Sequence, residues 1–270
     1  MRLEAWGGSE IGHVRTRNED SFALRPESVV SDREMGQALF AVADGMGGHP
    51  GGDVASSVAV AAVLETERNS AEPEREWLAR MHDAAQAAIE LRARQDPRLS
   101  QMGTTLTVAL VSEGLCWINH VGDTRLYWVR GSRIAGVTRD HTVAQEMVDA
   151  GRLAASASDG HPMGNVLTRC LGVCPDQRAD RPERPLALQP GDCLILATDG
   201  LIKTMAPDAL PGMLASSSVE AAGRAMLSAA LANGAPDNVT VVLVRVIEAP
   251  SASATGGETF EEVAAAVTSQ

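Results

Sequence analysis

The sequence predicts an α+β protein in which antiparallel sheets are covered by helices. Apolar runs at 104–111 and 115–121 are separated by only three residues, which indicates antiparallel pairing. Other segments carry apolar residues three and four positions apart, which indicates helices, and the two kinds of segment do not alternate as in a βαβ fold. Because no repeat or linker precedes residue 248, residues 1–247 are expected to form one domain.

Strands are expected where continuous apolar runs end at turn residues or at an acid. They are 38–43, 104–111, 115–121, 125–131, 192–201 and 238–247. The expected helices are 53–67, 73–95, 142–151 and 217–232. Pro73 suits the first turn of the second helix, and Gly151 and Gly234 suit the ends of the last two. The polar segment 152–169 is expected to be irregular.

The composition argues against several classes of protein. The 270 residues carry a net charge of −12 and a pI of about 4.9, whereas binding to nucleic acid requires a basic surface. An anionic membrane surface is disfavoured for the same reason. No apolar stretch approaches the roughly 20 residues that span a bilayer, and the N-terminus lacks the apolar centre of a signal peptide, so a cytoplasmic protein is expected.

The cysteines show no paired spacing of the kind that binds zinc. They are Cys116, Cys170, Cys174 and Cys193. Reduced thiols in the core of a cytoplasmic protein are therefore expected.

Five acidic residues stand at strand ends or in turns. Asp44 follows ALFAVA, Asp199 follows LILAT, and Asp237 precedes NVTVVLV; Asp123 lies between two strands, and Asp20 ends RTRNED. A carboxylate at the rim of an apolar strand is unfavourable unless it is paired or binds a cation. With no Cys or His cluster beside these acids, Mg²⁺ or Mn²⁺ fits better than zinc. The alternative is that each acid only ends a strand or begins a turn.

The glycine-rich loop in FAVADGMGGHPGGDVAS follows Asp44 directly. Such loops often bind phosphate, but no Gly-Lys-Ser/Thr follows, and Pro50 stands where a dinucleotide-binding loop has its last glycine. The loop is therefore expected to serve the neighbouring acid. Without a side chain, Gly45 can bring its carbonyl close to a metal ion.

Seven segments follow one another in the order VRTRNEDS, VADGMGGHPGGDVAS, MGTTL, VGDTRLY, VLTRCLG, LATDGL and PDNVTVVLV. Together they resemble the protein phosphatase 2C family, the metal-dependent Ser/Thr phosphatases, in its bacterial form. The resemblance extends from about residue 8 to residue 247. It implies a four-layer α/β/β/α sandwich, with two central antiparallel sheets flanked by helix pairs and a centre of two Mn²⁺ or Mg²⁺ ions at one end.

The resemblance also implies roles for the acids as metal ligands. Asp44 would bridge the two metals, and Gly45 would offer its carbonyl to one of them. Asp199 and Asp237 would hold the other metal. Two further acids, Glu19 and Asp20, would act through metal-bound waters. Asp123 would join Asp199 at a weaker third metal site.

Hydrolysis would then proceed by attack of a hydroxide held between the metals on a phosphoserine or phosphothreonine monoester. Arg15 matches the arginine that grips the substrate phosphate, and residues 142–170 match a mobile flap beside the site. Two positions depart from patterns in the family. Met46 stands where many eukaryotic members have a histidine proposed as general acid, and Gly164 replaces an arginine of the flap.

The proton donor is consequently open. His49 and His161 are candidates, and a structural role for each is the alternative. The implied partners are phosphorylated proteins, namely a bacterial Ser/Thr kinase and its substrates, and the protein is expected to be a monomer. Two other functions remain open: a pseudophosphatase that binds without turnover, and an unrelated metal-dependent phosphoesterase acting on small molecules or nucleic acid.

The tail, residues 248–270, begins with small and polar residues and is expected to be flexible. Within it, Thr259 and Glu262 form a capping-box pattern, and Phe260, Val263 and Val267 fall on one face. A short helix at 259–267 that docks on the domain or on a partner is therefore predicted, with an unstructured end as the alternative.

Overall fold

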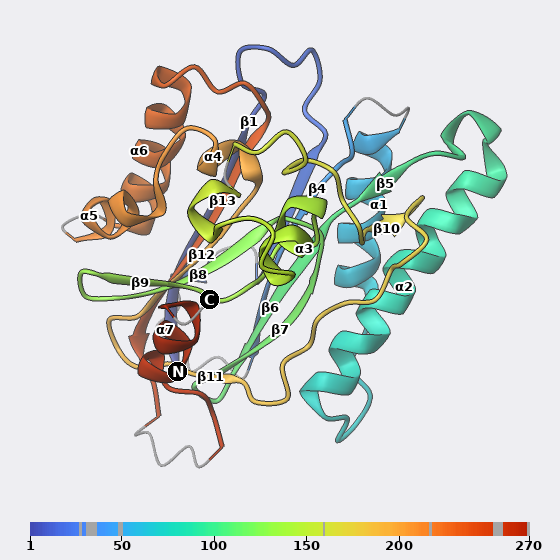
Figure 1. Ribbon diagram of the computed structural model, residues 1–270. Helices are drawn as coiled ribbons and strands as arrows, with labels where there is room; N and C mark the ends of the chain where they lie inside the picture. The colour runs from blue at the N-terminus through green and yellow to red at the C-terminus, as the bar shows by residue number, and fades with distance from the viewer. Residues whose placement is uncertain are drawn as a thin grey trace.

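The structure of the protein is a computed structural model. The structure describes residues 1–26, 29–30, 37–47, 51–158, 160–215, 218–250 and 256–268. Its centre is formed by two β-sheets that lie face to face (Figure 1). Within the described part of the chain, no helix is both long and apolar enough to cross a membrane.

The larger sheet has six strands. These are β1 (Arg2–Glu10), β3 (Val29–Val30), β8 (Arg125–Arg130), β9 (Arg133–Gly136), β12 (Cys193–Ala197) and β13 (Val239–Glu248). Their order across the sheet is β3-β1-β13-β12-β8-β9, and every neighbouring pair is antiparallel. The first and last strands in sequence, β1 and β13, therefore lie side by side.

The second sheet has five strands. They are β2 (Asp20–Arg25), β4 (Gln37–Asp44), β6 (Leu106–Ser112), β7 (Leu115–Val121) and β11 (Leu186–Ala187). Their order is β11-β7-β6-β4-β2, again antiparallel throughout. A separate short pair joins β5 (Gly103–Thr104) to β10 (Leu171–Gly172) beside the end of β4.

Helices cover the outer face of each sheet (Figure 1). On the five-stranded sheet they are α1 (Gly52–Glu65) and α2 (Glu74–Gln95). On the six-stranded sheet they are α4 (Asp199–Ile202), α5 (Leu210–Leu214) and α6 (Val219–Ala232). The remaining helices are α3 (Val143–Asp149) and α7 (Phe260–Thr268), with short 3₁₀ turns at Pro97–Leu99, Ala155–Ala157 and Pro207–Ala209.

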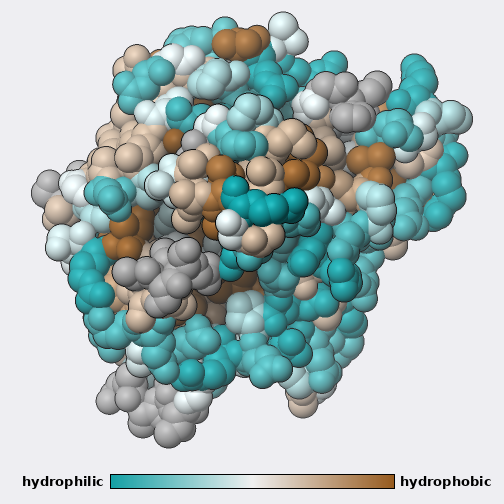
Figure 2. Space-filling view, viewed as in Figure 1, coloured by the Kyte–Doolittle hydropathy of each residue, from teal (hydrophilic) through white to brown (hydrophobic). Residues whose placement is uncertain are grey.

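The strand β4 shows why the expected strands are continuously apolar. Phe40 and Val42 pack between the two sheets, whereas Leu39 and Ala41 pack against α1 and α2. Both faces of such a strand are buried, so neither face can be polar. The predicted four-layer α/β/β/α sandwich is confirmed. The face of the molecule seen in Figure 2 is a mixture of hydrophilic residues and smaller hydrophobic areas.

Two strands that the sequence pattern did not reveal are β1 and β2. Most residues of β1, RLEAWGGSE, are only half-buried, and charged and glycine residues interrupt its pattern. The neighbouring β2, DSFALR, is likewise only half-buried for most of its length. Their pairing with β13 and β4 supplies the hydrogen bonds that local hydrophobicity does not predict.

The expectation that all four cysteines are reduced core thiols is wrong for one pair. Cys170 and Cys174 form a disulfide, with their Cα atoms 5.3 Å apart. The chain turns sharply around β10, which brings Cys170 and Cys174 together. Two cysteines four positions apart do not by themselves predict a disulfide. Cys116 and Cys193 are free and buried, as expected.

The tail packs on the domain at residues 256–268. Glu258 forms a bridge with Leu186 of the edge strand β11, and α7 lies beside β9, the edge strand of the other sheet (Figure 1). The Phe260 ring is fully buried in the core between the sheets and meets Trp128 edge to face, with ring centroids 5.3 Å apart. Thr259 and Glu262 make the hydrogen bonds of a capping box. The side chain of Val267 lies outside the described residues.

Candidate metal centre and active site

The acids predicted from the sequence come from both sheets and meet at one end of the sandwich. In the six-stranded sheet, Ala197 at the end of β12 pairs with Arg125 on one side and with Val241 on the other. Asp199 therefore lies near Asp123, which precedes β8, and near Asp237, which precedes β13. In the five-stranded sheet, Asp44 at the end of β4 is the register partner of Asp20 at the start of β2.

Asp44 is held through its backbone. Its N–H donates to the Thr105 hydroxyl at 2.8 Å, and its carbonyl accepts from the Thr104 hydroxyl at 2.8 Å. The carboxyl group is free of these bonds, and its pKa is raised well above the usual range by burial and then by the charge of Asp20 and other acids. The fold thus fixes the backbone and leaves the carboxylate for a cation.

Asp20 accepts two hydroxyl hydrogen bonds at Oδ2, from Thr198 at 3.0 Å and from Thr240 at 2.7 Å. Burial nevertheless raises the pKa of Asp20 to about 7, because it outweighs both hydrogen bonds and neighbouring Asp199 adds to it. Burial also raises the pKa of Asp123 well above the usual range, with Asp199 adding to the effect. These groups repel one another when they are all charged.

Two cationic side chains reach into this cluster. Arg15 forms a two-pronged ion pair with Asp237, with Nε 2.8 Å from Oδ1 and Nη2 2.9 Å from Oδ2. Lys203 Nζ lies 2.5 Å from Asp199 Oδ2 and 3.0 Å from Asp237 Oδ2. Although burial alone would raise the pKa of Asp237, Lys203 and Arg15 lower it by more. Glu19 lies farther from Arg15 than Asp237 does, with its Oε2 atom 3.9 Å from Arg15 Nη1.

Gly45 lies where backbone segments converge. A Cβ at this position would overlap the carbonyl oxygen of Gly52 and lie 2.5 Å from that of Glu19. Its N–H donates to the Glu19 carbonyl at 3.1 Å, and the N–H of Met46 donates to Gly103 at 3.0 Å. The guanidinium of Arg15 lies against Gly47, where a Cβ would collide with it. His49, one candidate proton donor, lies outside the described residues.

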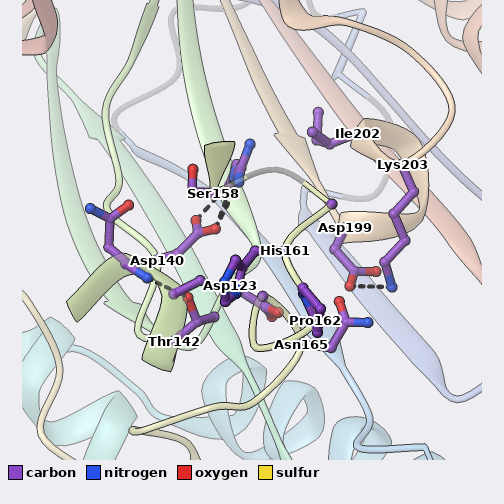
Figure 3. Close-up of a pocket in the computed structure, with 15 residues that line it drawn as sticks. Asp123, Asp140, Thr142, Ser158, His161, Pro162, Asn165, Asp199, Ile202 and Lys203 are labelled. Atoms are coloured by element: carbon purple, nitrogen blue, oxygen red, sulfur yellow. Dashed lines mark hydrogen bonds and ion pairs between the residues drawn. The ribbon is translucent and has the colours of Figure 1, made fainter. Parts of the chain in front are cut away.

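The flap begins at α3 and borders a cleft of about 580 Å³. The cleft is lined by Asp123, Asp199 and Lys203 and by flap residues that include His161 and Asn165 (Figure 3). The Nδ1 atom of His161 accepts a hydrogen bond from the Met163 N–H at 3.1 Å. Gly164 also lines the cleft, so no arginine reaches it from that position.

Sequence reasoning missed four residues that order the site. Thr198 and Thr240 hold Asp20, and Lys203 pairs with two of the acids. Asn238 accepts from the Glu19 N–H at 2.9 Å and donates to the carbonyls of Ile11 and Arg17. Each stands within four residues of a predicted acid, in LATDGLIK or PDNVT, and that proximity is the signal that could have revealed it.

The donor set fits a divalent cation. Asp20 Oδ1 and Asp199 Oδ1 are buried without a hydrogen-bond partner in the described part of the chain, and buried carboxylate oxygens of this kind favour a hard cation. As the side chains lie, no three His, Cys, Asp or Glu residues among those described are arranged to hold one ion. Asp199 and Asp237 are instead turned toward Lys203 and Arg15, and these contacts would have to loosen for an ion to bind.

Comparisons with known proteins agree with this architecture. The family profile described as protein phosphatase 2C matches residues 8–239. The chain is 32% identical over 246 residues to the serine/threonine protein phosphatase PstP of Mycobacterium tuberculosis, a match that covers 89% of this chain but only 44% of that protein. It is 30% identical to the protein phosphatase PhpP of Streptococcus pneumoniae, covering 89% of this chain and 96% of PhpP.

The fold also matches the crystal structure of the catalytic domain of PstP in complex with two manganese ions. The TM-score is 0.73 at 31% identity, and the match covers 91% of this chain and 99% of that chain. With the ordered motifs and the meeting of acids from both sheets, these matches show that the chain belongs to the protein phosphatase 2C family.

Proposed function

We propose that this protein is a metal-dependent phosphoprotein phosphatase that hydrolyses phosphoserine and phosphothreonine monoesters. The observation that carries the proposal is the meeting of five buried or half-buried aspartates at one end of the sandwich, where two carboxylate oxygens have no partner among the described residues. The names of PstP and PhpP as protein phosphatases support the class of substrate.

The proposed metal ligands are the residues that the sequence motifs predict. Asp44, Gly45, Asp199 and Asp237 would hold two Mn²⁺ or Mg²⁺ ions, Glu19 and Asp20 would act through water, and Asp123 with Asp199 would hold a third. Bound divalent ions would lower the pKa of water and neutralise the charge of the phosphate. The chain itself fixes the backbone of Asp44 through Thr104 and Thr105, so that its carboxylate is presented at a defined place.

Arg15 is proposed to bind the substrate phosphate. Its guanidinium lies beside the glycine loop at Gly47, and Asp237 holds it by two contacts. A planar guanidinium can offer two parallel N–H groups to two phosphate oxygens, and lysine cannot. Asp237 occupies Nε and Nη2 of Arg15 in this structure, so a metal ion bound at Asp237 would release the guanidinium for the phosphate.

The flap is proposed to complete the substrate cleft. His161 lines the cleft together with Asp123 and Asp199, and it is the described candidate for the group that protonates the leaving alcohol. The hydrogen bond from the Met163 N–H occupies Nδ1, which leaves Nε2 as the atom that would carry the transferable proton.

A phosphate-release assay tests the proposed function. The full chain is incubated with a phosphothreonine peptide and with p-nitrophenyl phosphate, each with Mn²⁺, with Mg²⁺ or with EDTA, beside the Asp44→Asn variant. Metal-dependent release from the peptide by the wild-type chain alone is the expected result. Metal binding without turnover would indicate a pseudophosphatase. Turnover of the aryl ester without the peptide would indicate a small-molecule phosphoesterase.

The proposal extends to organisation and partners. Residues 1–247 would be the catalytic domain, with 248–270 as a tail that adds α7 to it. A monomer acting in the cytoplasm on a bacterial Ser/Thr kinase and its substrates is the proposed setting, because ATP-dependent kinases produce phosphoproteins there. The Cys170–Cys174 disulfide is unusual for that compartment, where thiols are kept reduced.

A further inference from the structure

Lys203 is the sole lysine of this chain. The remaining 22 of its 23 basic residues, counting Lys and Arg, are arginines. That one lysine stands inside the acid cluster, with its ammonium between Asp199 and Asp237. Unlike a rigid, planar guanidinium, an ammonium is a compact charge on a flexible stem, so it can sit between two carboxylates and also leave them.

The position of the ammonium follows from the helix α4. Asp199 begins α4, and Lys203 follows four residues later, so the two side chains lie on the same face. The Lys203 N–H donates to the Asp199 carbonyl at 2.8 Å, which fixes the backbone. In Figure 3 the ammonium meets the Asp199 carboxylate at the wall of the cleft, and the lysine side chain is 28% exposed. Solvent is therefore within its reach.

The ammonium binds the carboxylates to which the proposed function assigns one metal ion. Asp199 Oδ2 and Asp237 Oδ2 are its partners, while Asp199 Oδ1 is buried without any partner in the described chain. The ammonium thus places a positive charge at oxygens of both carboxylates, 2.5 Å from Asp199 Oδ2 and 3.0 Å from Asp237 Oδ2. Two cations at the same oxygens repel each other, and only one can be accommodated well.

We infer that Lys203 is a tethered cation that competes with a divalent ion for Asp199 and Asp237. It neutralises the two acids when no metal is bound, and it must move away when a metal binds. It therefore weakens metal affinity at this position while it stabilises the metal-free fold. This inference rests on the proposed function, in which these acids are metal ligands.

Calorimetric titration of Mn²⁺ into the chelator-treated full chain tests the competition. We expect Lys203→Met, which keeps the length but loses the charge, to bind Mn²⁺ about tenfold more tightly than wild type. The same variant should melt at a lower temperature than wild type in EDTA and at a similar temperature in saturating Mn²⁺. Lys203→Arg, which retains the charge, should show no gain in affinity. Arg224→Met, which loses a charge at the exposed pair with Glu220 on α6, should remain near wild type.

A second measurement reports displacement directly in the wild-type chain. Because only Lys203 and the N-terminus carry amines, acetylation by an N-hydroxysuccinimide ester can be followed at Lys203 by peptide mass spectrometry. Saturating Mg²⁺ should accelerate acetylation of Lys203 several-fold relative to the N-terminus, because the ammonium leaves its two carboxylates.

The outcomes separate this inference from the proposed function. If Lys203→Met binds Mn²⁺ with wild-type affinity, or if metal does not change the acetylation rate, the competition is refuted while the metal site stands. If neither wild type nor variant binds Mn²⁺ or Mg²⁺, the proposed function and the inference fall together.

Discussion

Asp20 and Asp44 face each other as register partners across the antiparallel strands β2 and β4. Burial raises the pKa of Asp20 to about 7, and burial together with the charge of Asp20 holds the pKa of Asp44 well above its usual range. A pair of acids placed in this way destabilises the fold whenever both are charged without a cation. Stability and metal binding are therefore coupled at this pair.

The first prediction concerns the loss of charge at Asp44. In EDTA, Asp44→Asn should raise the melting temperature, because it removes a buried carboxyl group whose ionisation is opposed by burial and by the charge of Asp20. With Mn²⁺, the variant should lose tight metal binding and turnover, since its amide cannot bridge two ions. Calorimetry and thermal melting with and without metal check both effects. A variant that binds two Mn²⁺ ions as tightly as wild type would refute the bridging assignment.

The second prediction separates Asp123 from the other acids. Asp123→Ala should keep two tight Mn²⁺ sites and normal phosphate binding through Arg15, yet lose more than about tenfold in kcat. The physical reason is that a third cation can assist late in the reaction while contributing little to substrate binding. Asp83→Ala, at an exposed acid on α2, is the control. Loss of both tight metals, or full kcat at limiting Mn²⁺, would show the three-metal assignment to be wrong.

The third prediction is a pH dependence of stability due to His120. Burial, assisted by neighbouring His141, lowers the pKa of His120 to about 3. The unfolded chain takes up this proton near pH 6.5, so between the two values it binds more protons than the folded state, and stability falls as pH is lowered. Lowering the pH from 6.5 to 5.0 should therefore reduce the unfolding free energy by about 1.5 kcal/mol through His120 alone.

Urea denaturation at the two pH values measures this effect. His120→Gln should lose that part of the pH dependence, whereas His13→Gln, at an exposed histidine, should retain it. If His120→Gln shows the same loss of stability between pH 6.5 and 5.0 as wild type, His120 is not the responsible group.

The fourth prediction concerns the flap and the size of the substrate. Met163 is 37% exposed at the flap. Met163→Ala should lower kcat/KM on a phosphothreonine peptide several-fold but change it less than about twofold on p-nitrophenyl phosphate, because the small ester needs only the metals and Arg15. Leu91→Ala, at an exposed apolar residue of α2, should leave both substrates unaffected. Equal losses on the two substrates would exclude a role in protein recognition.

The fifth prediction tests the docking of the tail. Phe260 is fully buried against Trp128, so Phe260→Ala should cost about 3 kcal/mol of unfolding free energy or more. The exposed ion pair of Glu261 with Arg133 should matter much less, which makes Glu261→Gln the matched control. Urea denaturation compares the two variants, and equal effects would mean that α7 does not contribute to the core.

The sequence by itself determined the α+β class, the strands with two buried faces, the long helices and the set of acids. These features depend on local pattern: a strand buried on both faces must be continuously apolar, and an acid at its end is conspicuous. The ordered motifs also identified the family, and with it the four-layer α/β/β/α sandwich that the structure confirms.

Tertiary structure alone decided which half-buried segments pair, as with β1 beside β13, because their hydrogen bonds come from strands more than 200 residues away. It also decided that Cys170 joins Cys174 and that Phe260 fills the core between the sheets. Above all, it decided that Lys203 meets both Asp199 and Asp237. The helical spacing from Asp199 to Lys203 is visible in the sequence, but the contact with Asp237 exists only because β12 and β13 pair at this end of the sheet.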